Sequence, residues 1–172
     1  MARVILLSGP KFSGKSRFVE RLARELREAG VRVSGFFQRG VFDGAGNKIG
    51  YDLVDVAAGA TRPLARISGA RDAWVFDDAA FADAAANLDS EAELVIVDEA
   101  GPLELSGRGH RQTLERALDG RGPILLVVRE ELEESFRAML ATRAGTAHVR
   151  YLPQSAGETS ERIRELLALA GS

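Results

Sequence analysis

The chain has 172 residues, a formal net charge of −2, no cysteine and two histidines. This length predicts a single domain over residues 1–172, and the composition excludes disulfides, thiolate metal sites, a cysteine nucleophile and a histidine-rich zinc site. The slightly acidic charge balance argues against a nucleic-acid-binding protein held by bulk electrostatics.

Apolar runs and helical periods alternate along the chain. Val4–Ser8 is a continuous apolar strand, residues 15–29 repeat apolar side chains with a helical period, and Val31–Phe37 again resembles a strand. The same patterns then predict a helix at Asp77–Leu88, a strand at Leu94–Val97, a helix at His110–Leu118, a strand at Ile124–Val128, a helix at Glu130–Thr142, a strand at Ala147–Tyr151 and a helix at Glu158–Leu167.

Residues 41–68 break this alternation, because turn residues and alternating stretches predict an inserted β-hairpin or meander there. Elsewhere, strands that are apolar on both faces and are joined by helices imply an α/β fold, a three-layer sandwich with a mainly parallel central sheet. The apolar run in the opening MARVILLSGP is too short to span a membrane. We therefore expect a soluble cytoplasmic protein without a membrane partner.

The strongest motif is GPKFSGKS at residues 9–16, which fits the P-loop pattern GxxxxGK(S/T) between a buried strand and an amphipathic helix. In such a loop, glycines permit the turns, and successive N–H groups together with the helix dipole bind the phosphates of a nucleotide. The alternative is a glycine-rich turn without a ligand. The predicted nucleotide-binding residues are Gly9, Pro10, Lys11, Phe12, Ser13, Gly14, Lys15, Ser16 and Arg17.

Two residues of this loop are assigned chemical roles. Lys15 brings a positive charge to the β- and γ-phosphate oxygens, and the Ser16 hydroxyl is a ligand for Mg²⁺. The chain has twenty arginines but only three lysines, and two of the three, Lys11 and Lys15, fall inside the motif.

A second motif, LVIVDEAGPLE at residues 94–104, ends a buried strand with two adjacent acids. Asp98 is predicted to hold Mg²⁺ beside the loop serine, and Glu99 to orient and polarise the attacking water. Adjacent carboxylates repel each other unless a cation or a reacting proton lies between them. The competing interpretations are a turn-forming or helix-capping role for Asp98 and a structural carboxylate for Glu99.

Three further residues are weaker candidates. Arg129 ends a strand at the edge where ligands bind in such folds, and Arg108 lies in the loop after the acids, so that either could face the γ-phosphate. The alternative for both is a solvated arginine. Glu104 either caps the helical segment after Gly101 or forms hydrogen bonds to the residues that bind the metal ion.

The aromatic residues are ambiguous. Tyr51 and Trp74 either stack on a base or belong to the core. We expect His110 to begin a helix, to be solvated and to have no catalytic role.

Both motifs resemble those of the THEP1-type nucleoside-triphosphatases, the cancer-related nucleoside-triphosphatase homologues, from the P-loop to about Arg129. The resemblance implies a RecA-like P-loop fold and slow Mg²⁺-dependent hydrolysis of several nucleoside triphosphates (NTPs). The family's arginine-rich hairpin segment is replaced here by FFQRGVFDGAGNKIGY, in which Arg39 and Lys48 are the positive charges. The matching features are Gly35-Phe36, Gly50-Tyr51, Leu64-Ala65-Arg66, and Asp98-Glu99-Ala100-Gly101 with Glu104 and Ser106.

The sequence thus predicts a nucleoside-triphosphatase that uses Mg²⁺ and hydrolyses ATP, GTP or other NTPs. Two alternatives remain open: a nucleotide or small-molecule kinase, and a nucleotide-dependent switch or assembly protein that acts on a protein partner. The sequence has no base-recognition motif, so base preference is open.

Overall fold

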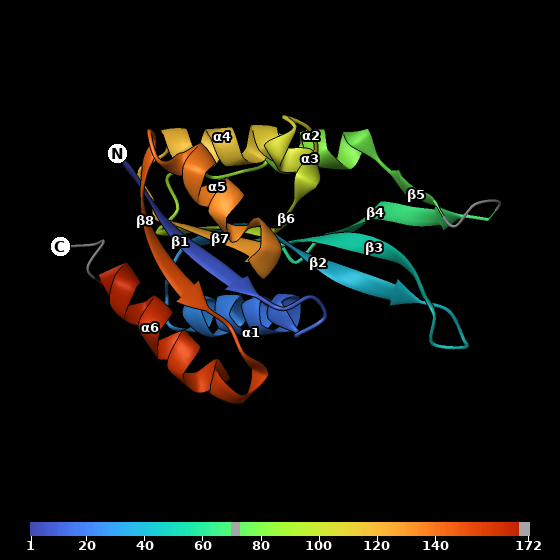
Figure 1. Cartoon of the computed structure of the whole chain (residues 1–172), viewed down its shortest axis with the longest axis horizontal. Coiled ribbons are helices and arrows are strands. Elements are labelled where there is room, and N and C mark those ends of the chain that lie inside the picture. Colours follow the sequence, from blue (N-terminus) through green and yellow to red (C-terminus); the bar gives the residue numbers. More distant parts are fainter. Residues whose placement is uncertain (70–72, 169–172) are drawn as a thin grey trace.

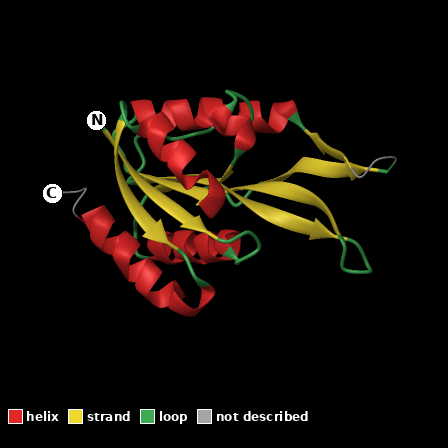
Figure 2. Ribbon diagram, in the orientation of Figure 1, coloured by secondary structure: helices red, strands yellow, loops and turns green. Residues whose placement is uncertain are grey.

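The computed structural model describes residues 1–69 and 73–168. One eight-stranded sheet lies between two layers of helices (Figures 1 and 2). Its elements are β1 (Ala2–Gly9), α1 (Lys15–Glu28), β2 (Val33–Phe42), β3 (Lys48–Asp55), β4 (Thr61–Ser68), β5 (Ala73–Phe76), α2 (Asp78–Ala86), β6 (Leu94–Ala100), α3 (Pro102–Leu105), α4 (Arg111–Asp119), β7 (Ile124–Arg129), the 3₁₀ turn η1 (Glu130–Leu132), α5 (Glu133–Leu140), β8 (Ala144–Arg150), the 3₁₀ turn η2 (Pro153–Ser155) and α6 (Ala156–Ala168).

The strand order is β5-β4-β3-β2-β6-β7-β1-β8. The five strands β2, β6, β7, β1 and β8 run parallel, so their carboxyl ends share one edge of the sheet. Strands β3, β4 and β5 continue from β2 as an antiparallel meander, which extends to the right of the body in Figure 1. The predicted mainly parallel sheet with an inserted meander is confirmed.

Alternate faces of the buried strands build two cores. Side chains such as Leu6, Val97 and Leu126 pack against α2, α4 and α5, whereas Leu7 and Ile96 pack against α1 and α6. Strands that are apolar on both faces require helices on both faces, and Figure 2 shows these helices above and below the sheet. The three-layer arrangement follows from this alternation.

Most predicted elements are present within a few residues of their expected bounds. Two were missed: the four-residue helix α3 and the edge strand β5, whose four residues are all exposed. Strand β2 also continues five residues beyond the predicted Phe37, because it pairs with β3 as far as Phe42. No helix among residues 1–69 and 73–168 is long and apolar enough to cross a membrane.

The prediction that His110 is solvated is wrong. It does precede α4, but its side chain is only 1% exposed. The imidazole stacks on Phe36 with a centroid distance of 3.8 Å, and Phe81 meets it edge-on at 4.5 Å. Because both rings come from segments distant in the sequence, local polarity gave no sign of this burial.

Candidate functional site

The loop between β1 and α1 contains two residues with left-handed backbone conformations, of which one is a glycine. Gly14 has φ 87°, and Phe12 adopts a left-handed conformation with φ 60° although it is not a glycine. Such a conformation costs energy in an L-residue, and it leaves the Phe12 ring 78% exposed at the tip of the loop. The strain is therefore stored in the loop that is predicted to bind phosphate.

Lys15 is held inside the loop. Its Nζ donates hydrogen bonds to the carbonyl oxygens of Gly9, at 3.0 Å, and Pro10, at 2.7 Å. Burial lowers the pKa of Lys15, and the negative charges of Glu99 and Asp98 oppose that shift. Both acceptors are neutral carbonyl groups, so a phosphate oxygen can replace them with a stronger, charge-assisted bond.

A pocket of about 320 Å³ opens in front of this loop. It is lined from the P-loop side, from the ends of β6 and β7, and from the β2–β3 hairpin. Seven of the predicted nucleotide-binding residues therefore share one cavity with Glu99 and Arg129, while Gly9 and Pro10 lie behind and hold Lys15. The lining residues are Lys11, Phe12, Ser13, Gly14, Lys15, Ser16, Arg17, Gln38, Gly40, Phe42, Lys48, Tyr51, Glu99 and Arg129.

Asp98 lies fully buried at the end of β6. Its Oδ2 accepts a hydrogen bond from the Gln38 N–H at 3.0 Å, whereas its Oδ1 has no hydrogen-bond partner among the described residues. Burial, with a further contribution from the Glu99 charge, raises the pKa of Asp98 to about 7, and the Ser16 hydroxyl opposes the shift. A buried carboxylate oxygen that is unpaired beside a serine hydroxyl is chemically suited to Mg²⁺.

Glu99 breaks the regular strand. Its φ is 57°, and the pairing of β6 with β7 shifts register between Val97 and Ala100. Such a bulge re-aims a side chain, and here Glu99 lines the pocket directly after the buried Asp98. The two acids therefore occupy different environments, one beneath the pocket and one facing it.

The two candidate arginines line different cavities. Arg129 lines the P-loop pocket, where its Nη1 lies 3.8 Å from Oε1 of Glu131. Arg108 lines a different cavity, together with Phe76 and Phe81. Of these two guanidinium groups, the structure brings only Arg129 to the predicted phosphate site.

Glu104 faces inward. Its Oε2 accepts from the Gly101 N–H at 2.7 Å and its Oε1 accepts from the His110 N–H at 2.8 Å. Burial raises the pKa of Glu104, and these two N–H groups oppose the shift. The carboxylate joins both ends of the segment after the acidic strand, which is the capping interpretation.

The hairpin residues of the pocket were not assigned from sequence. Gln38, Gly40, Phe42 and Lys48 reach the P-loop only because β2 extends past the sheet edge and pairs with β3. Tyr51 lies among them, and its ring centroid is 5.1 Å from that of Trp74, which remains 39% exposed. The sequence signals for this region were the rarity of lysine and the place of Lys48 as one of two positive charges in the hairpin segment.

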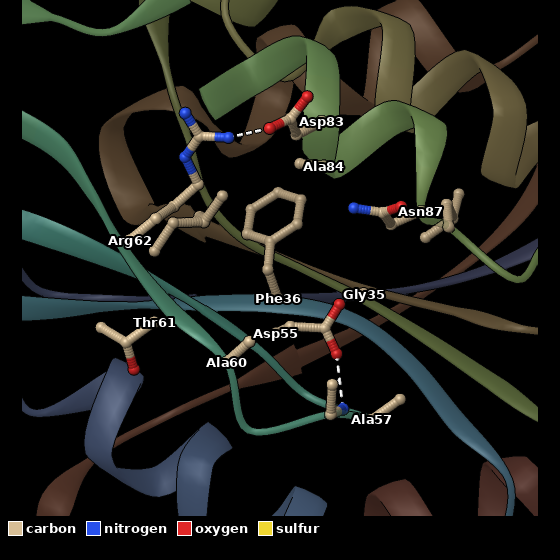
Figure 3. A pocket seen from close by; sticks show the side chains of 13 residues that line it. Gly35, Phe36, Asp55, Ala57, Ala60, Thr61, Arg62, Asp83, Ala84 and Asn87 are labelled. Atoms are coloured by element: carbon tan, nitrogen blue, oxygen red, sulfur yellow. Dashed lines mark hydrogen bonds and ion pairs between the residues drawn. The ribbon is translucent and has the colours of Figure 1, made fainter. Parts of the chain in front are cut away.

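A second cavity, of about 430 Å³, lies between α2 and the turn that joins β3 to β4 (Figure 3). Its charged groups are already engaged: Arg62 pairs with Asp83 and Asp77, and Asp55 accepts from the Ala58 N–H at 2.7 Å. No P-loop residue lines it. This cavity is therefore separate from the predicted phosphate site.

Comparison with known proteins agrees with this geometry. A family model described as NTPase matches residues 4–158. The chain belongs to the THEP1-type nucleoside-triphosphatase family. It is 30% identical over 176 residues to nucleoside-triphosphatase THEP1 of Methanopyrus kandleri, covering 96% of this chain and 95% of that protein. It is 29% identical over 143 residues to the human cancer-related nucleoside-triphosphatase, covering 73% of this chain and 74% of that one.

Solved structures of this family share the fold. The solution structure of a human cancer-related nucleoside triphosphatase superposes with a TM-score of 0.70 at 22% identity, covering 96% of this chain and 97% of the other. The crystal structure of THEP1 from Aquifex aeolicus gives a TM-score of 0.66 at 15% identity, covering 95% and 98%. The predicted P-loop fold is therefore confirmed.

Proposed function

We propose that this chain is a Mg²⁺-dependent nucleoside-triphosphatase, which hydrolyses ATP, GTP and other nucleoside triphosphates to the diphosphate and phosphate. The observation that carries the proposal is the convergence of Lys15 and Glu99 on one pocket, above a buried Asp98 that has one oxygen unpaired within the described part of the chain. The names of the family's members support the reaction class.

The binding step uses the loop. The N–H groups around Gly14 and the start of α1 bind phosphate oxygens, and Lys15 exchanges its two carbonyl acceptors for the β- and γ-phosphates. Ser16 and Asp98 are the side chains that would hold Mg²⁺, which, when bound, neutralises charge on the phosphate oxygens. The free Asp98 Oδ1 fits that role.

In the chemical step, Glu99 orients a water molecule toward the γ-phosphorus. The water oxygen forms a bond to phosphorus, the bond from phosphorus to the β–γ bridging oxygen breaks, and the diphosphate leaves with that electron pair. The water gives up its proton to the Glu99 carboxylate, which releases it to solvent. The strained φ of Glu99 is consistent with a side chain that is held for this purpose.

The test is phosphate release from ATP, GTP, CTP and UTP, with Mg²⁺ and with a chelator. We expect Glu99→Gln to lower kcat by about 10²–10⁴-fold while nucleotide affinity changes only a few-fold. Lys15→Ala should weaken both binding and turnover. Glu130→Gln is a matched control, because Glu130 lies at the same sheet edge but is paired with Arg150 at 3.2 Å and does not line the pocket.

Mg²⁺-dependent binding of NTPs without release of phosphate would refute the hydrolase proposal. A kinase acceptor or a protein partner would then have to be sought. Full activity of Glu99→Gln would instead refute the role of Glu99 and leave the reaction itself standing.

A further inference from the structure

The lysines of this chain gather at one place. The sequence contains three lysines and twenty arginines, and all three lysines, Lys11, Lys15 and Lys48, line the P-loop pocket. Lys11 and Lys15 belong to the motif itself. Lys48 comes from the first residue of β3, on the hairpin that faces the loop.

Lys48 is held by aromatic rings rather than by an acidic partner, as far as residues 1–69 and 73–168 show. Its Nζ lies 4.8 Å from the ring centroid of Tyr51, 5.3 Å from that of Phe12 and 5.6 Å from that of Phe42. It donates to the Tyr51 hydroxyl at 3.3 Å. Within residues 1–69 and 73–168, no carboxylate lies within ion-pairing distance of it. Cation–π contacts hold an ammonium group without neutralising its charge, so Lys48 stays available to an anion.

The hairpin backbone is adapted to place this side chain. Lys48 lies directly across from Phe42 in the β2–β3 pairing. A Cβ atom at Gly40 would meet the Phe42 ring at 2.9 Å and Cε of Lys48 at 3.3 Å, so the glycine leaves room for both. Phe12 reaches the same cluster from the P-loop.

The β2–β3 hairpin also lies beside the strand end that carries Asp98 and Glu99. Strand β2 is the parallel neighbour of β6, and its Gln38 N–H binds Asp98 directly. In the proposed reaction the γ-phosphoryl group lies toward Asp98 and Glu99, which is therefore the side from which Lys48 approaches. Arg129 also lines the pocket, but the carboxylate of Glu131, 3.8 Å away, offsets part of its charge.

We propose that Lys48 is a catalytic residue, which swings from its aromatic contacts onto a γ-phosphoryl oxygen and stabilises the charge that develops there during transfer to water. This inference rests on the proposed NTPase function. Phosphoryl transfer depends mainly on such electrostatic stabilisation, and a cation contributed by the same chain meets that need without a partner protein.

The test compares Lys48→Met, Lys48→Gln and Lys48→Arg with the wild type in single-turnover hydrolysis and in binding of Mg²⁺–NDP. We expect Met and Gln to lower the rate constant by about 100-fold or more. Affinity for NDP should change less than about threefold, because NDP has no γ-phosphoryl group. Lys48→Arg, which keeps the charge, should recover much of the rate.

The matched control is Arg39→Met. Arg39 is a cation on the same hairpin, but it pairs with Glu20 at 2.8 Å and lies outside the pocket, so its loss should leave turnover unchanged. Circular dichroism melting curves check that each variant is folded.

A Lys48→Met protein with a rate constant within about threefold of wild type would overturn the proposal. So would equal losses of NDP affinity and of rate, since these would assign Lys48 to ground-state binding or to hairpin structure. These outcomes can be distinguished from a failure of the proposed NTPase function, because in that case the wild type would release no phosphate from any NTP.

Discussion

His110 is expected to make the protein sensitive to mild acid. Its side chain is 1% exposed between Phe36 and Phe81, and burial lowers its pKa from the ordinary 6.5 to about 3. Between these values the unfolded chain binds a proton that the folded protein excludes. The folded pKa is depressed, so stability from this group is complete above pH 6.5 and is lost as pH falls toward 3.

The magnitude follows from linkage. Between pH 7 and pH 5, selective protonation of the unfolded state removes about 2 kcal/mol of unfolding free energy. Neither ring nitrogen of His110 has a hydrogen-bond partner among the described residues. An apolar replacement of similar size, His110→Leu, therefore leaves no orphaned partner behind.

The assay is urea denaturation of nucleotide-free wild type and His110→Leu at pH 7 and pH 5. Ligand must be absent because binding adds its own stability. We expect the variant to lose about 2 kcal/mol less than the wild type over this range. Other titrating groups are common to both proteins and cancel in the comparison. Losses that agree to within about 0.5 kcal/mol would refute the reasoning.

Three further changes test other parts of the structure. Gly35 has φ 103°, and a Cβ atom there would lie 2.0 Å from the Ile96 carbonyl oxygen, so Gly35→Ala should lower the unfolding free energy in urea by about 3 kcal/mol or more. Gly59 has open space around it, so Gly59→Ala should lower the unfolding free energy by only about 1 kcal/mol. Glu104→Gln replaces one of two acceptor oxygens with a donor, and a melting temperature lower by about 3–6 °C is expected; an unchanged value contradicts the bridging role. The pKa of Asp98 is raised from 3.8 to about 7, so the folded protein loses stability as pH rises between these values and the buried carboxyl ionises. Asp98→Asn should therefore have a higher melting temperature than wild type at pH 8. Addition of Mg²⁺–nucleotide should not raise the melting temperature of this variant.

The P-loop and the acidic strand could be predicted because their chemistry is local in the sequence. A glycine-rich turn between a buried strand and a helix places Lys15 and Ser16 with little help from the rest of the chain. Asp98 follows from the apolar run before it. The side on which Glu99 lies depends on a single backbone bulge, which alternating polarity does not reveal.

Residues that reach the site through long-range pairing could not be assigned. Lys48 and Phe42 face the P-loop because of the register between β2 and β3, and a one-residue slip would turn them away. The burial of His110 likewise depends on Phe36 and Phe81, which arrive from a strand and a helix far along the chain. Such positions are determined by topology, and the local pattern specifies only that a strand or helix is present.

The charges around the pocket explain why the free protein is prepared for a polyphosphate. Among the described residues, five basic side chains line the pocket in a chain whose net charge is −2, and Glu99 is the one acid in that lining. Lys15 is meanwhile restrained by neutral carbonyls and Lys48 by aromatic rings, so neither charge is neutralised within the loop or the hairpin. A triphosphate neutralises the excess positive charge of the pocket more completely than a monophosphate does, because more of its oxygens contact cationic side chains. We therefore expect selectivity to follow the number of phosphates, with nucleoside monophosphates bound more weakly than triphosphates of the same base.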